Sequence, residues 1–142
     1  MKFGPIYVDH IGIATLSLDE ASKFWRLLGL NEGDEDEVVI EQGVKTRFFS
    51  TSTGQSNNHP AQIELLEPTS QDTPIGKFLD KRGPGIQQLC FSVGDLLGLI
   101  EHLLDNGITM IDIVPRKGAG GKDIAFVHPK STGGVLVELT QA

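Results

Sequence analysis

The sequence is poor in cysteine, in basic residues and in long apolar runs. Cys90 is the single cysteine, so the chain cannot form an internal disulfide, which is typical of a reducing compartment and leads us to expect a cytoplasmic protein. Lysine and arginine number 12 against 19 acidic residues, for a net charge of −7, which argues against a broad basic face for nucleic acid. No apolar run approaches the ~20 residues of a membrane helix, and residues 1–7 lack a signal-peptide pattern. We therefore expect no nucleic-acid partner and no membrane partner.

Glycine, in contrast, is abundant, with 17 of the 142 residues. The length suits a single domain with a sizeable core. Many glycines indicate many tight turns, and hence many short strands.

The chain contains an internal repeat, whose first copy begins with an alternating, β-branched stretch at residues 7–15. Ser17 and Glu20 follow as a capping box, which predicts a helix start. A helical stripe comes next, formed by Ala21, Phe24, Trp25 and Leu28. Gly29 can adopt the left-handed conformation that ends a helix.

The second copy follows at an offset of 78 residues, with a strand at 86–93, a cap at Asp95 and a stop at Gly107. Each predicted helix precedes further strand-like segments, which are 38–42, 45–51 and 61–66 in the first copy and 109–114, 123–128 and 135–140 in the second. The sequence therefore predicts one α+β domain made of two tandem β-α-β-β-β modules, at about 5–68 and 85–141. A linker helix of about 73–83 joins them, and their mixed sheet curls around a cavity.

Four polar residues interrupt predicted strands where apolar residues are expected: His10, Glu64, Gln88 and Glu138. His10 and Gln88 are related by the offset of 78, and the two glutamates share apolar flanks at an offset of 74. A buried carboxylate needs a partner, and one divalent metal ion would satisfy all four groups while keeping positions open for a substrate. The alternative is that the four side chains face solvent on the outer side of the sheet.

Several segments resemble the vicinal oxygen chelate superfamily, which includes glyoxalase I, extradiol dioxygenases and bleomycin-resistance proteins, and the resemblance is strongest to its methylmalonyl-CoA epimerases. The matching segments are DHIGIA (9–14), EQGV (41–44), IELLEP (63–68), PIGKFL (74–79) and HPKSTGGVLVELTQ (128–141). The resemblance implies a metal held by His10, Glu64, Gln88 and Glu138, with Glu138 also transferring a proton. It further implies an acyl-CoA thioester as substrate and a homodimer.

Two positions depart from the family pattern. Gln88 stands where the family usually has histidine, which should weaken binding of zinc, nickel and cobalt relative to magnesium or manganese. Thr46 stands where the family has a second acid–base glutamate, and threonine cannot act as a base near pH 7. Asp123, if aligned with Thr46 by pairing Phe49 with Phe126, could replace that glutamate. Its other interpretation is an exposed charge at the start of a strand.

Two charged segments have open interpretations. Gly118–Lys122, with Arg116, Lys117 and Lys130, could bind the phosphates of CoA or could form a flexible hairpin. Residues 32–37 carry five carboxylates, for which we expect a solvated turn.

The sequence predicts a metal-dependent epimerase or isomerase that removes the proton next to a metal-chelated thioester. One alternative is a lyase of the glyoxalase I type, which acts on a thiol adduct. The other is a non-catalytic binding protein of the bleomycin-resistance type, against which the complete set of four polar positions argues.

Overall fold

A computed structural model describes residues 2–51 and 60–142 of the chain. It divides into two compact units, which are described separately below. The 10–87 unit comprises His10–Gln87, and the 88–142 unit comprises residues 88–142 together with the first nine residues. Within the described residues, no helix is long and apolar enough to cross a membrane.

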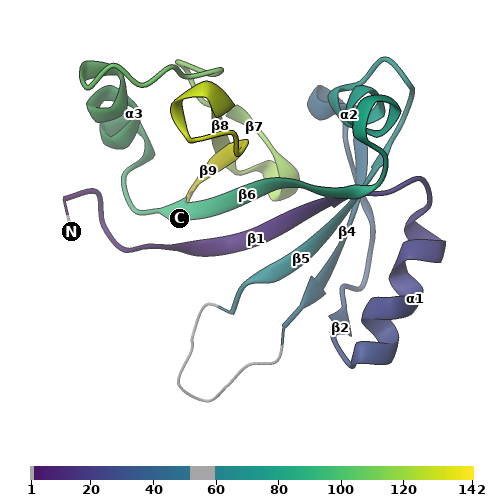
Figure 1. Cartoon of the computed structure of the whole chain (residues 1–142). Coiled ribbons are helices and arrows are strands. Elements are labelled where there is room, and N and C mark those ends of the chain that lie inside the picture. The colour runs from purple at the N-terminus through teal and green to yellow at the C-terminus, as the bar shows by residue number, and fades with distance from the viewer. Residues whose placement is uncertain (1, 52–59) are drawn as a thin grey trace. The chain divides into compact units, whose positions relative to one another are not determined.

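The 10–87 unit is a mixed sheet with helices α1 (Leu18–Leu28) and α2 (Pro74–Arg82) (Figure 1). Its strands are the end of β1 (Ile6–Ala14), then β2 (Asn31–Glu32), β3 (Glu37–Val39), β4 (Val44–Ser50) and β5 (Gln62–Pro68). Strand β4 pairs antiparallel with β5 along its whole length, and with β2 and β3 along its other edge. Strand β1 pairs parallel with β5, with Gly12 opposite Glu64.

Helix α1 forms where the sequence predicts it. The Ser17 side chain accepts a hydrogen bond from the backbone N–H of Glu20, and Gly29 ends the helix in the left-handed conformation. The helix packs on one face of the sheet over a core that includes Phe49 and Leu65, which are both fully buried. The opposite face of β4 and β5 is therefore the one on which Glu64, the predicted polar residue of β5, can lie.

The 88–142 unit repeats this plan with helix α3 (Leu96–Asp105). Its strands are β6 (Gly85–Val93, which starts in the other unit), β7 (Arg116–Lys117), β8 (Asp123–Val127) and β9 (Val137–Gln141). Strand β6 pairs parallel with β9, and β8 pairs antiparallel with both β9 and β7. Short 3₁₀ turns at Ala119–Gly121 and Pro129–Ser131 connect these strands. A core cluster that includes Val93, Ile100 and Leu139 joins α3 to one face of this sheet.

The α+β class, the mixed sheet and the repeated strand–helix order are confirmed. The predicted strand at 109–114 is wrong, because only Met110 forms a bridge there, to Val127. The Asp112 carboxylate accepts a hydrogen bond from the Phe126 backbone N–H at 2.8 Å, which takes the place of a ladder bond and ends the pairing.

The predicted strand at 38–42 is half right. Strand β3 ends at Val39, and a 3₁₀ turn at Ile40–Gln42 follows. Gly43 closes this turn with φ of 62°, a conformation that favours glycine. The module boundaries at about 68 and 85 stay a prediction.

Candidate metal centre

The first polar pair lies within the 10–87 unit and consists of His10 on β1 and Glu64 on β5. The His10 Nε2 atom lies 3.2 Å from Glu64 Oε1. Both residues are buried, at 6% and 3% exposed. Parallel pairing sets Glu64 opposite Gly12, two residues beyond His10 on the same side of β1, which brings the two side chains together.

Phe48 on β4 packs beside this pair. It pairs with Glu64 across the ladder, so their side chains project from the same face of the sheet. Its ring meets the His10 imidazole edge-on, with centroids 5.7 Å apart and planes at 87°. This contact packs one side of the imidazole ring. Sequence reasoning did not single out Phe48, because an aromatic residue in a strand has the same pattern as any core residue.

The second pair lies within the 88–142 unit and consists of Gln88 on β6 and Glu138 on β9. The Gln88 Nε2 group donates a hydrogen bond to Glu138 Oε1 at 3.0 Å. The two residues are 6% and 4% exposed. An amide that donates through nitrogen to a carboxylate still has a carbonyl oxygen, which is the ligand atom that glutamine offers a cation.

All four predicted residues are therefore buried, and the alternative of a solvent-facing outer sheet is wrong. Each pair offers one carboxylate and one neutral donor, which is an imidazole in the 10–87 unit and an amide in the 88–142 unit, and these are ligand types that divalent cations accept. Burying two carboxylates costs several kcal/mol each by general estimates unless a cation or hydrogen bonds compensate. The residues of each pair thus fit a role as metal ligands.

The ladder registers correct the proposed equivalence of Thr46 and Asp123. Phe48 lies opposite Glu64, and Phe126 lies opposite Glu138. The offset between the two modules is thus 78 here, and the counterpart of Thr46 is Ile124. Asp123 is exposed at the start of β8, where its carboxylate accepts a hydrogen bond from Lys117 at 2.7 Å. Asp123 is therefore the exposed charge of the second interpretation.

Thr46 itself is 2% exposed and lies on the same face of the sheet as Phe48 and Glu64. The position at which the resemblance implies a second acid–base glutamate is thus a buried hydroxyl in this chain, and Thr46 offers no proton carrier there.

Two of the cationic side chains near the glycine loop at 118–122 form ion pairs with carboxylates. Arg116 lies 3.2 Å from Asp112, and Lys117 bonds Asp123. Within the loop, the Gly118 N–H donates to the Lys122 carbonyl at 2.9 Å. These contacts favour the hairpin interpretation over a phosphate cradle.

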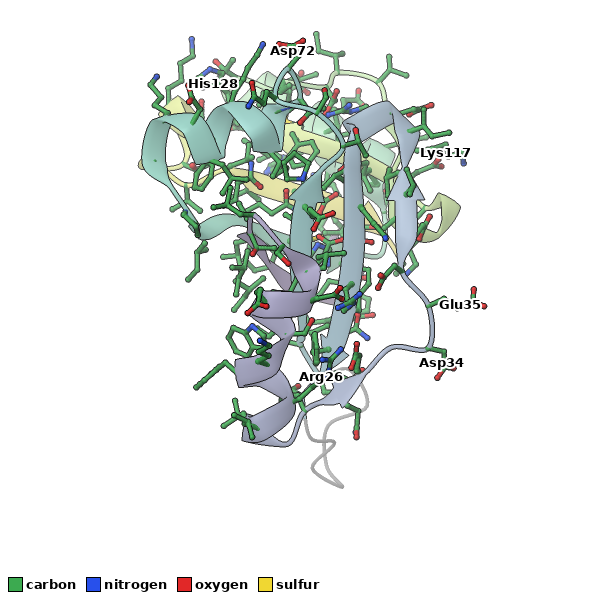
Figure 2. All side chains as sticks on the ribbon, turned by 90° about the vertical axis from the view of Figure 1, so that its right-hand side faces the viewer. Arg26, Asp34, Glu35, Asp72, Lys117 and His128 are labelled. Carbon is green, nitrogen blue, oxygen red and sulfur yellow. The ribbon has the colours of Figure 1, made fainter. Side chains whose placement is uncertain are left out.

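The acidic segment 32–37 differs from the expected solvated turn. Asp34 and Glu35 are exposed and point outward from the chain (Figure 2). Glu32 accepts two hydrogen bonds from Arg26, which lower the pKa of its carboxyl group. Asp36, in contrast, turns toward the sheet.

Arg47 on β4 binds both oxygens of Asp36, each at 2.7 Å, through its Nε and Nη2 groups. These hydrogen bonds hold the pKa of Asp36 below its ordinary value and raise that of Arg47. The chain between β2 and β3 is thereby tied to β4, and Glu37 follows directly as the first residue of β3.

Nearly the whole chain is similar in sequence to proteins of one superfamily. The profile of the glyoxalase/bleomycin resistance protein/dioxygenase superfamily matches residues 9–126. The uncharacterized protein YqjC of Bacillus subtilis is 39% identical over 135 residues, which cover 94% of this chain and 91% of that protein. The mitochondrial methylmalonyl-CoA epimerase of Dictyostelium discoideum is 36% identical over 99% of this chain and 81% of its own length.

Among solved structures, a Streptomyces coelicolor methylmalonyl-CoA epimerase variant in complex with 2-nitronate-propionyl-CoA superposes with a TM-score of 0.88. It is 34% identical, over 99% of this chain and 95% of the other. The methylmalonyl-CoA epimerase of Mycobacterium tuberculosis superposes with a TM-score of 0.85 at 37% identity, over 94% and 86% of the two chains.

Proposed function

The chain belongs to the glyoxalase/bleomycin resistance protein/dioxygenase superfamily, and from that premise we propose that it epimerises a methylmalonyl-CoA-like thioester. The observation that carries the proposal is the repeated buried pair, His10 with Glu64 and Gln88 with Glu138. Relatives that match nearly the whole chain at 34–37% identity are methylmalonyl-CoA epimerases by name. A binding protein would not need two strand-borne carboxylates at a burial cost.

The four residues of the two pairs would hold one divalent metal ion. When bound, such an ion supplies positive charge next to the thioester oxygen, on which negative charge develops as the neighbouring proton leaves. The glutamine at position 88 provides a neutral oxygen donor, which favours magnesium or manganese over softer ions. We further propose an acyl-CoA partner and a homodimer, the latter to be checked by analytical ultracentrifugation.

Glu138 is the residue we assign to proton transfer. Its carboxylate takes the proton from the carbon between the thioester and the free carboxylate, and the C–H electron pair moves into the enolate. Glu138 is 4% exposed and shares its face of the sheet with the buried Phe126, which lies opposite it on β8, so bulk water is excluded and every charge interaction of the carboxylate is strengthened. The Gln88 hydrogen bond fixes one oxygen of the carboxylate.

The test is deuterium incorporation at the α-carbon of methylmalonyl-CoA in D₂O, followed by NMR with magnesium or manganese present. We expect exchange by the wild-type protein and a loss of roughly 10²–10⁴-fold in Glu138→Gln. Glu101→Gln, an exposed glutamate on α3, is the matched control and should exchange normally. Elemental analysis of each protein separates a loss of metal from a loss of the base.

Absence of exchange by metal-loaded wild-type protein would refute the epimerase proposal. Turnover of the hemithioacetal of methylglyoxal, with no exchange of methylmalonyl-CoA, would instead favour the lyase of the glyoxalase I type.

A further inference from the structure

Glu37 is the residue of the acidic segment that a strand carries onto the sheet. It is the first residue of β3, it is half-buried, and it is followed by the exposed Val38 and the buried Val39. This alternation sets Glu37 and Val39 on the same, more buried face of β3. Glu37 therefore belongs to the sheet and not to the solvated turn that the composition of 32–37 predicts.

The ladder places Glu37 on the face that carries Glu64. Glu37 pairs directly with Thr46 across β3 and β4, and Thr46 pairs with Leu66 across β4 and β5. Directly paired residues of antiparallel strands project to the same side. Leu66 and Glu64 are two residues apart on β5 and so also share a side. Glu37 and Glu64 therefore project from one face of a single three-strand sheet within the 10–87 unit.

Glu37 and Glu64 are well separated on this shared face. Two strand spacings across the sheet and two residues along it put their Cα atoms roughly 12 Å apart. Thr46, the position of the family's second glutamate, lies on β4 between them.

We propose that Glu37 is the second proton-transfer group of this chain and that it replaces the carboxylate absent at Thr46. This inference rests on the proposed epimerase function. Inversion at a carbon needs one group that removes the proton and another that returns a proton to the opposite face. Glu138, proposed above, is one of these groups, and Glu37 is the one that the 10–87 unit contributes.

The step balances in both directions. One glutamate, as a carboxylate, takes the α-proton and becomes a carboxylic acid, while the C–H electron pair forms the enolate. The other glutamate, as a carboxylic acid, gives its proton to the α-carbon and becomes a carboxylate. The two carboxyl groups end with exchanged protonation states, and exchange with solvent restores them.

Local contacts fix the backbone that presents Glu37. Asp36, the preceding residue, is held at both oxygens by Arg47. The hydroxyl of Thr46 lies 3.5 Å from the Glu37 carbonyl oxygen, at the limit of a hydrogen bond. A residue between an ion-paired neighbour and a paired strand has little backbone freedom, which is what a proton-transfer group requires.

The experiment compares Glu37→Gln with Glu35→Gln, which removes an exposed charge two residues away. The R and S epimers of methylmalonyl-CoA are incubated separately in D₂O, and α-proton exchange and inversion are measured independently. We expect Glu37→Gln to lose inversion by roughly 10²-fold or more, while one epimer still exchanges its α-proton without inversion. Glu35→Gln should match the wild type in both measurements.

The double variant Glu37→Gln/Thr46→Glu returns a carboxylate to the neighbouring strand on the same face and should regain inversion. Thermal unfolding of each variant establishes that it is folded.

Inversion by folded Glu37→Gln at a rate similar to the wild type would overturn the assignment of Glu37 and leave the epimerase proposal standing. Equal loss of exchange from both epimers would also overturn it, because a merely structural residue would have that effect. Failure of the wild-type protein to exchange either epimer would overturn both proposals.

Discussion

Removal of the Arg47 guanidinium is the substitution that most directly tests how this sheet holds its acidic segment. Arg47→Met keeps the apolar stem of the side chain and deletes its hydrogen bonds to Asp36, Asp19 and Ser22. The Arg47 side chain is 11% exposed and that of Asp36 is 21% exposed, so water screens this pair only in part. Asp19 is 86% exposed and should contribute little.

The expected loss follows from these contacts. The two 2.7 Å bonds to Asp36 are charge-assisted, and the bond to the buried Ser22 hydroxyl is the next strongest contribution. After the entropy of holding a long side chain is discounted, Arg47→Met should lower the free energy of unfolding by about 2–4 kcal/mol. Arg26→Met removes an exposed pair and should have a much smaller effect.

The loss of unfolding free energy in Arg47→Met should also become smaller as the pH falls. The hydrogen bonds from Arg47 lower the folded-state pKa of Asp36, so their stabilisation is present above the unfolded carboxyl pKa of about 3.9. It disappears as the pH falls through the lower, folded-state pKa. The difference between wild type and Arg47→Met should therefore be constant near neutral pH and should narrow below about pH 4.

Urea denaturation followed by circular dichroism, repeated from pH 7 to pH 3, measures both effects. A double-mutant cycle with Asp36→Asn isolates the pair and should give a coupling of about 1–3 kcal/mol at neutral pH. A coupling below about 0.5 kcal/mol, or a cost of Arg47→Met that does not change with pH, would refute the reasoning.

Two further measurements test the core and the proposed metal centre. Phe49→Ala empties a fully buried site between Leu18 and Leu65, and urea denaturation should show a loss of about 3–5 kcal/mol; a loss under 1 kcal/mol would mean that α1 does not depend on this contact. Magnesium or manganese at about 100 times its dissociation constant should raise the melting temperature of the wild type by roughly 5–10 °C, a rise that EDTA reverses and Glu138→Gln abolishes. An equal rise in Glu138→Gln would place the ion elsewhere.

The sequence alone reveals the repeat because the helix caps and helix-ending glycines of both modules recur at one offset. Ser17 and Asp95 cap helices through bonds within three residues, and Gly29 ends α1 in a conformation that most residues avoid. Such signals depend on neighbours in the chain, so sequence alone reveals them. His10, Glu64, Gln88 and Glu138 were also readable, because a polar residue inside an apolar alternation is conspicuous.

The sequence predicts the ends of the strands less well, because hydrogen bonds from side chains to the backbone decide where a ladder ends. The segment 109–114 has the composition of a strand, yet the Asp112 carboxylate replaces a ladder bond to Phe126. The composition of 32–37 predicts a solvated turn, yet Asp36 is drawn to Arg47, which lies eleven residues further along the chain. Neither partner is identified by the local pattern.

The sequence by itself determined the fold class, the duplication and four polar positions on strands. Only the tertiary structure decided which residues lie opposite one another, and so which ones share a face. Period-two alternation shows that a strand has two sides, but the register with a neighbouring strand is set by pairing and packing. The registers make Ile124, and not Asp123, the counterpart of Thr46, and this difference of one residue puts Asp123 on the other side of its strand. The same registers place Glu37 directly opposite Thr46.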